Sequence, residues 1–203
     1  KEVGTATSTA TSSGRTSNNN TPGSALPLSN VEAPASLNPT SKKRFEAMKS
    51  AYNQVFRRDG EVGGMCAQWT YNLARAYTLN LKNQPANIGK KLAAGGNANW
   101  NKQYHTNLIK LGYSQTKSIV TKSQLISKLV TTTWGYGDVV VYWSNDGPKS
   151  QSHVMYGHTQ IYVGEINKPK WASSKRLNYN TYFPYGKRIG DNWTYIVFRA
   201  PST

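Results

Sequence analysis

The stretch GDVVVYWSNDGPKSQSHVMYGHTQIYVG, residues 137–164, decides the fold class of this chain. It holds two runs of β-branched and aromatic residues, at 139–143 and 158–163, and the polar residues between them are typical of a turn. Two later segments, WASS at 171–174 and TYIVFRA at 194–200, are also predicted to be strands. We therefore predict antiparallel strands in the C-terminal part of the chain.

The residues before this stretch repeat their apolar side chains with a period close to 3.6, which is typical of amphipathic helices. A hydroxyl cap at Thr40 or Ser41 predicts one helix over 41–58. Further helices are expected at about 65–79, at 101–111, and from a capping box at 121–124 to about residue 129. Helices followed by antiparallel strands make an α+β pattern.

The first 40 residues have a different composition, with Ser, Thr, Asn, Ala, Gly and Pro and almost no large side chains. Such a segment cannot offset the entropy that it loses on ordering. We therefore divide the chain into an N-terminal arm or linker at 1–40 and a folded domain at 41–203. A neighbouring subunit of an assembly is the partner that we expect to hold the arm.

The chain is strongly basic, with 25 Lys and Arg against nine Asp and Glu and a formal net charge of +16. This charge predicts a polyanionic partner, either nucleic acid or the anionic polymers of a bacterial wall. Nucleic acid is the less favoured of the two, because the basic residues are scattered and form no known reader motif. A third interpretation is that the charge only keeps the protein in solution.

The chain has one cysteine, Cys66, and three histidines, His105, His153 and His158. An internal disulfide is excluded, and too few ligands remain for a structural zinc site, so we expect neither a metal nor another cofactor. The sequence contains no run of about 18 apolar residues and no signal peptide, so we expect no membrane span.

Cys66 follows Gly63 and Gly64 and lies in the first turn of the second predicted helix. Free backbone N–H groups and the helix dipole stabilise a thiolate at that place, so we expect a lowered pKa and a nucleophilic thiol. The two glycines would let a substrate approach the backbone closely. The alternative is that a lone cysteine serves as a small buried hydrophobic residue.

A nucleophilic cysteine needs a base, which is commonly a histidine. His158 is the best candidate because it begins a predicted strand, with Gln160 and Tyr162 on the same face. His153 would lie on the opposite face if the strand extended back to it. His105 lies in a predicted helix, where we expect a structural role.

Four segments in this order, MCAQWTYNLARAY (65–77), NLIKLGY (107–113), GDVVVYW (137–143) and GHTQIYVG (157–164), resemble the motif series of CHAP domains. These are cysteine, histidine-dependent amidohydrolases/peptidases of the papain-like NlpC/P60 superfamily. The likeness covers about residues 60–200 and is greatest to the versions in phage lysins and in virion- or tail-associated murein hydrolases. It implies an α+β papain-like fold in which N-terminal helices pack on an antiparallel sheet.

The resemblance implies that Cys66 attacks an amide carbonyl of peptidoglycan. His158 would remove the thiol proton and later protonate the leaving amine. The oxyanion would be held by the Cys66 backbone N–H at the helix start and by one further donor. Asp138 would begin a strand and take no part in catalysis.

The third member of the triad is the point at which this sequence departs from the family. Relatives place an acid, an amide or a second histidine on the strand after the Gly-His strand, where this chain has KWASS at 170–174. Only serines occupy the expected place, and we predict Ser174 for the position. Asn178 or Asn180 could reach back from the following loop, whereas Glu165 lies on the wrong face.

The expected function is that of a peptidoglycan hydrolase, either a murein endopeptidase or an N-acetylmuramoyl-L-alanine amidase, carried on a phage particle to breach the wall. Tyr156 and Trp171 are expected to be exposed and to stack on substrate sugars. The expected location is the virion or the extracellular or periplasmic space, with the arm bound to other virion or tail proteins. The alternative function is a catalytically weak or inactive virion module that binds anionic wall polymer or DNA.

Overall fold

The computed structural model describes residues 31–57, 66–86, 102–147, 157–167, 170–173, 178–179 and 190–202. These residues form an α+β arrangement, so the expected fold class is confirmed. The elements are α1 (Pro39–Arg57), α3 (Cys66–Leu81), α4 (Lys102–Lys110), β1 (Ser114–Val120), α5 (Lys122–Thr131), β2 (Val139–Ser144), β3 (His158–Tyr162), the 3-10 helix η2 (Gly164–Asn167), β4 (Trp171–Ala172), β5 (Asn178–Tyr179) and β6 (Trp193–Arg199).

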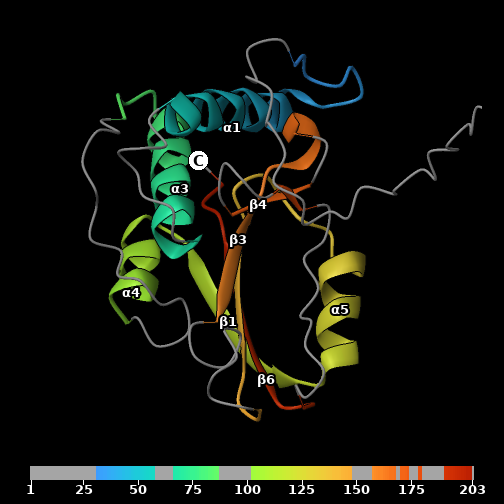
Figure 1. Cartoon of the computed structure of the whole chain (residues 1–203). Helices are drawn as coiled ribbons and strands as arrows, with labels where there is room; N and C mark the ends of the chain where they lie inside the picture. The colour runs from blue at the N-terminus through green and yellow to red at the C-terminus, as the bar shows by residue number, and fades with distance from the viewer. Residues whose placement is uncertain are drawn as a thin grey trace, which may run out of the picture.

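The strands of the described residues form one sheet of six strands in the order β1-β6-β2-β3-β4-β5, and every neighbouring pair is antiparallel. Helices α3 and α4 lie on one side of β3 and α5 lies on the other, whereas α1 runs across the top of the view (Figure 1). Each face of the sheet therefore has its own hydrophobic cluster, one with α1, α3 and α4 and a smaller one with α5. We call these the three-helix face and the α5 face.

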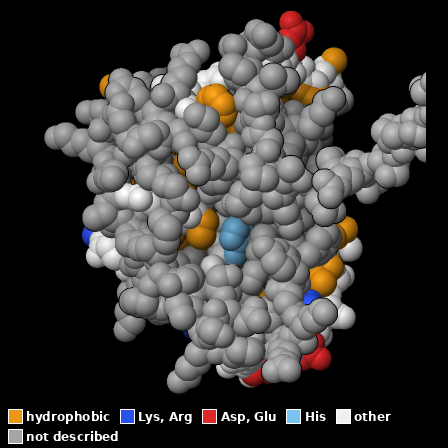
Figure 2. Space-filling view, in the orientation of Figure 1, with side chains coloured by type: hydrophobic (Ala, Val, Ile, Leu, Met, Phe, Trp, Pro, Cys, Tyr) orange, Lys and Arg blue, Asp and Glu red, His pale blue; other side chains and the backbone are white. Residues whose placement is uncertain are grey.

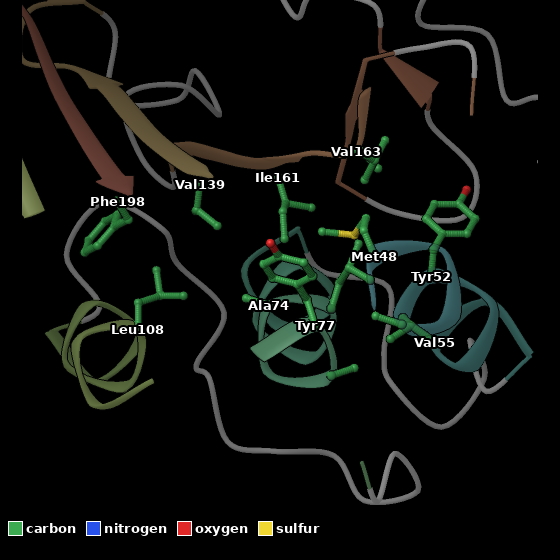
Figure 3. Packing of buried hydrophobic residues seen from close by; sticks show 14 of the residues in the cluster. Met48, Tyr52, Val55, Ala74, Tyr77, Leu108, Val139, Ile161, Val163 and Phe198 are labelled. Atoms are coloured by element: carbon green, nitrogen blue, oxygen red, sulfur yellow. The ribbon is translucent and has the colours of Figure 1, made fainter. Parts of the chain in front are cut away.

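The core of the three-helix face is built where α3 crosses β3. Ile161 and Val163 of the strand and Tyr77 of α3 are fully buried, and Figure 3 shows them with Met48 and other side chains of α1 packed alongside. Gly137 permits this packing, because it has a φ of +85° and a Cβ there would collide with the Tyr77 ring. This packing fixes the position of α3, the helix that begins at Cys66, relative to the sheet.

Helix α1 begins earlier than its hydroxyl residues indicate. The side chain of Asn38 accepts a hydrogen bond from the Ser41 backbone N–H at 2.8 Å, so Asn38 is the cap and Pro39 is the first helical residue. The cap predicted at Thr40 or Ser41 is therefore wrong. A proline at the first position costs no hydrogen bond, because that N–H has no partner within the helix.

The segment 31–38 belongs to the packed part of the chain, although its composition assigns it to the arm. Val31, Ala33 and Leu37 pack against the core of the three-helix face. The Val31 carbonyl also accepts a hydrogen bond from Lys49 of α1 at 2.9 Å. The boundary predicted at residue 41 is therefore too late, whereas residues 1–30 of the arm lie outside the described residues.

The predicted strands and the last helix agree with the structure within a few residues, but β1 is not predicted, and neither is the short strand β5, which lies where a loop is expected. The capping box of Thr121 and Gln124 is present, and α5 continues to Thr131. Strand β1 is an edge strand whose first four residues are exposed, so it shows no alternation of apolar residues. It is a strand because it pairs with β6 along its whole length, which is a contact between distant parts of the chain.

Candidate active site

Cys66 is the first residue of α3, as its sequence position predicts, and its side chain is half-buried. The helix is anchored by an apolar stripe that contains Trp69, Leu73 and Tyr77, all fully buried. Because this stripe packs against β3 and α1, the first turn of α3 is directed at the start of β3. The thiol is therefore held by the core of the domain.

The thiol lies against the backbone at the start of β3. Backbone groups of Thr159, of Ala67 and of Cys66 itself hydrogen-bond to the sulfur, and each of these bonds lowers the pKa of the thiol. Burial acts in the opposite direction and is the largest effect, so the pKa of Cys66 is raised above its ordinary value. The expectation of a lowered pKa is wrong, because desolvation of the thiolate outweighs the donors at the helix start.

Tyr104 of α4 is a further neighbour of the thiol, and the sequence analysis did not identify it. Its hydroxyl lies 2.7 Å from Thr159 Oγ1, and Thr159 Oγ1 donates to the Val140 carbonyl at 2.9 Å. Because threonine has a single hydroxyl proton, Tyr104 is the donor in the first of these bonds. Burial, and to a smaller extent the negative charge of a Cys66 thiolate, raises the pKa of Tyr104, so a neutral phenol lies close to the sulfur.

His158 is the first residue of β3, as predicted, and its side chain is buried. Its ring lies 5.5 Å from the ring of Tyr142, the residue that it pairs with on β2. By the alternation of a strand, His158 starts on the face opposite to Thr159. At the start of β3, the backbone of Thr159 therefore lies against the Cys66 thiol, whereas the imidazole of His158 lies against the ring of Tyr142. Figure 2 shows a histidine side chain beside a hydrophobic one in the middle of the face presented in Figure 1.

Gln160 is a buried polar residue two positions beyond His158 on the same face of β3. Its side chain is fully buried, and neither of its amide atoms has a hydrogen-bond partner in the described part of the chain. A buried amide without partners costs about 1–3 kcal/mol. The Gln160 amide therefore makes an unfavourable contribution to the free energy of folding.

Replacement of Gln160 by leucine is accordingly expected to raise the free energy of unfolding by about 1 kcal/mol or more. Leucine has nearly the same volume and removes the unpaired amide. Urea unfolding of the variant and of the wild type, under the same conditions, checks this expectation. A variant that is less stable than the wild type would show that the amide is satisfied in solution.

Asp138 holds the start of β2 and has the structural role expected of it. Its carboxylate accepts hydrogen bonds from the backbone N–H groups of Gly135 at 2.8 Å and Ala200 at 2.9 Å. It also forms an ion pair with Arg199 at 2.8 Å. The carboxylate is buried and its oxygens are occupied by these three donors, so it fixes β2 to the end of β6.

Trp171 is not an exposed stacking platform. Its side chain is 1% exposed and lies in the cluster of the α5 face. Its ring is in edge contact with Trp134 at 5.0 Å and with Tyr162 at 5.4 Å. The expectation of exposure is wrong, because β4 pairs with strands on both sides and an inner strand turns its large side chains into the core.

Several other candidates lie outside the described residues, namely Gly63, Gly64, His153, Tyr156, Ser174 and Asn180. The side chains of Glu165 and Asn178 are likewise not described. His105, which we expected to be structural, is half-buried in α4 and stacks on Trp143 at 6.4 Å with an interplanar angle of 19°. Of the predicted catalytic residues, the structure therefore places Cys66 and His158.

The raised pKa of Cys66 predicts slow alkylation of the resting protein at neutral pH. A raised pKa means that the folded chain holds a smaller thiolate fraction than the unfolded chain at any given pH. The rate of reaction with iodoacetamide should therefore rise through the alkaline range, with an inflection above that of the same protein in denaturant. An inflection below the denatured control would instead show that an imidazolium pairs with a preformed thiolate.

No group of three or more His, Cys, Asp or Glu side chains that could hold a metal ion occurs within the described ranges. In the same part of the chain, none of the helices combines the length and the apolar character needed to cross a bilayer. No family model, curated protein or solved structure matches the chain.

Proposed function

We propose that this protein is a cysteine peptidoglycan hydrolase with a papain-like fold of the CHAP type. The observation that carries the proposal is the contact between the Cys66 thiol at the first residue of α3 and the Thr159 backbone, one residue after His158. Nucleophilic amide cleavage needs a base within reach of the thiol, and the proposal assigns this role to His158, the residue that precedes Thr159 in the chain. The motif order and the α+β architecture support the same proposal.

In the proposed reaction, His158 removes the proton of the Cys66 thiol while the sulfur attacks an amide carbonyl of peptidoglycan. The new carbon–sulfur bond gives a tetrahedral intermediate. The intermediate collapses with cleavage of the carbon–nitrogen bond, and the leaving amine takes the proton from His158. Because the pKa of the resting thiol is raised, proton removal accompanies attack rather than preceding it.

The acyl group is then bound to Cys66 as a thioester. A water molecule gives a proton to His158 and attacks the thioester carbonyl, which releases the carboxylic acid and restores the thiol. The Cys66 backbone N–H at the start of α3 has no partner within the helix, so it can donate to the oxyanion in both steps. Ser174 remains the predicted third member of the triad.

The remaining parts of the proposal concern where the enzyme works. The charge of +16 would attract the protein to phosphate-bearing wall polymers and increase the encounter rate, most strongly at low salt. The N-terminal arm would tether the domain to other virion or tail proteins. The bond cut is that of an endopeptidase or an N-acetylmuramoyl-L-alanine amidase.

Digestion of purified sacculi tests the proposal and also identifies the bond. Mass spectrometry of the soluble products should find peptide fragments with a new amino terminus if a peptide bond is cut, or free stem peptides if the amidase bond is cut. The Cys66→Ala variant is the negative control. Products that consist only of sugar fragments with intact stem peptides would contradict amide cleavage.

The second candidate function is binding without catalysis, to anionic wall polymer or DNA. It is favoured by the net charge of +16 and by the raised pKa of the thiol. Digestion of sacculi distinguishes the two functions, because a binding module would release no fragments from them. Its retention on DNA would fall steeply as the salt concentration increases.

A further inference from the structure

A cavity of about 480 Å³ opens on the α5 face, between the end of α5, the end of β3 and the start of β4. Its volume lies in the range of small-molecule sites. The lining residues are Leu129, Val130, Thr132, Thr133, Trp134, Tyr162, Lys170 and Trp171. None of the sites described above makes use of this cavity.

The aromatic wall of the cavity is held in a fixed geometry. The Trp134 indole N–H donates to the Leu129 carbonyl at 3.1 Å, and the guanidinium of Arg199 lies 4.9 Å from the Trp134 ring. Arg199 is itself fixed by the Asp138 carboxylate and by the Thr133 carbonyl. Buried Trp171 supports Trp134 from behind, whereas Trp134 and Tyr162 are half-buried and present part of their rings to the cavity.

The lining combines three features that together suit a sugar. Half-buried aromatic rings pack against the apolar faces of a saccharide, and the nearby hydroxyls of Thr132 and Thr133 can bond its hydroxyl groups. Lys170 adds an exposed donor, and the described lining contains no carboxylate. A neutral ligand with hydroxyl and amide groups matches this set, whereas a cationic ligand does not.

The position of the cavity relative to His158 follows from the geometry of β3. Tyr162 lies on the same face of β3 as His158, four residues further on, which corresponds to about 13 Å along a strand. Gln160, which lies between them on this face, is fully buried, so a ligand in the cavity is held apart from His158. We propose that the cavity binds an N-acetylated sugar of the glycan strand, as a site separate from the one that cleaves the amide bond. The proposal rests on the proposed function, since it names the part of the substrate that is held away from the cleaved bond.

Triacetylchitotriose is the probe for this proposal, because it has N-acetylated sugars but neither stem peptide nor phosphate. Its binding to full-length Cys66→Ala protein is measured by isothermal titration calorimetry. Thr133→Trp replaces a lining hydroxyl by an indole that occupies part of the cavity, and should weaken binding about tenfold or more. Ser127→Trp, at an exposed position of α5 outside the lining, is the matched control and should bind as the parent does.

Tyr162→Leu removes an aromatic face but keeps apolar bulk, so it provides a second test if Thr133→Trp does not fold. Weaker binding in either folded cavity variant, with the control unchanged, supports the proposal. Equal binding in all variants overturns it, and so does the absence of any binding by the parent. Binding of inorganic phosphate, with no binding of the sugar, also overturns it and would identify an anion site.

The sugar-binding proposal and the hydrolase proposal can each be rejected independently of the other. The titration uses a chain that lacks the thiol, so its outcome is independent of cleavage. If the sugar binds but the wild type releases no peptide fragments, the sugar-binding proposal is supported and the hydrolase proposal is rejected.

Discussion

Replacement of Cys66 by alanine is expected to lower the release of peptide fragments from sacculi by at least about a thousandfold, to the background rate. The proposed reaction forms its covalent intermediate on this sulfur, and alanine offers no nucleophile in its place. Alanine differs from cysteine only by the loss of the sulfur, and Cys66 lies at the end of its helix, so the replacement should change the free energy of unfolding little. Fragment release measured by chromatography, together with urea unfolding, checks both statements.

The two described histidines provide a matched pair for the same prediction. His158→Gln should reduce fragment release to a similar level, because it removes the proposed base. His105→Gln should leave most of the activity, since His105 lies in α4 and stacks on Trp143. Full activity of the His158 variant, or equal losses in both variants, would count against His158 as the base.

Replacement of Asp138 by alanine is expected to destabilise the domain by about 3 kcal/mol, which is a large part of the stability of a typical domain. The change leaves the N–H groups of Gly135 and Ala200 without their acceptor and leaves Arg199 without its ion pair. These three groups connect the start of β2 to the end of β6. Thermal and urea unfolding measure the loss.

Asp191→Ala is the control for that experiment. Asp191 is exposed and accepts one long hydrogen bond, 3.4 Å from the Lys122 backbone N–H, so its replacement should cost little. The Asp138 variant that remains folded at low temperature should cleave sacculi at close to the wild-type rate. A stable Asp138 variant with no activity would instead place this carboxylate in the chemistry.

Local patterns in the sequence predict much of the framework of the candidate site. The capping box at Thr121 and Gln124 and the helical stripe after Cys66 depend on residues a few positions apart, and both are present. The β-branched runs that become β2 and β3 are also local. These features place Cys66 at a helix start and His158 at a strand start.

The features that the sequence does not reveal arise from contacts between distant segments. Tyr104 has the pattern of a core residue of α4, and only the folded chain brings its hydroxyl to Thr159. The burial of Trp171 follows from the pairing of β4 on both sides. The raised pKa of Cys66 results from desolvation, which the position of the residue in its helix does not indicate.

The most direct test of the central claim is to trap the thioester on Cys66. Wild-type protein is mixed with solubilised peptidoglycan, quenched in acid and digested, and the peptide that contains Cys66 is weighed by mass spectrometry. We expect an added mass equal to that of a stem-peptide acyl fragment, which hydroxylamine removes and which the His158→Gln variant does not acquire. Rapid release of cleavage products with Cys66 unmodified under all quench conditions, or undiminished release by Cys66→Ala, would contradict the account.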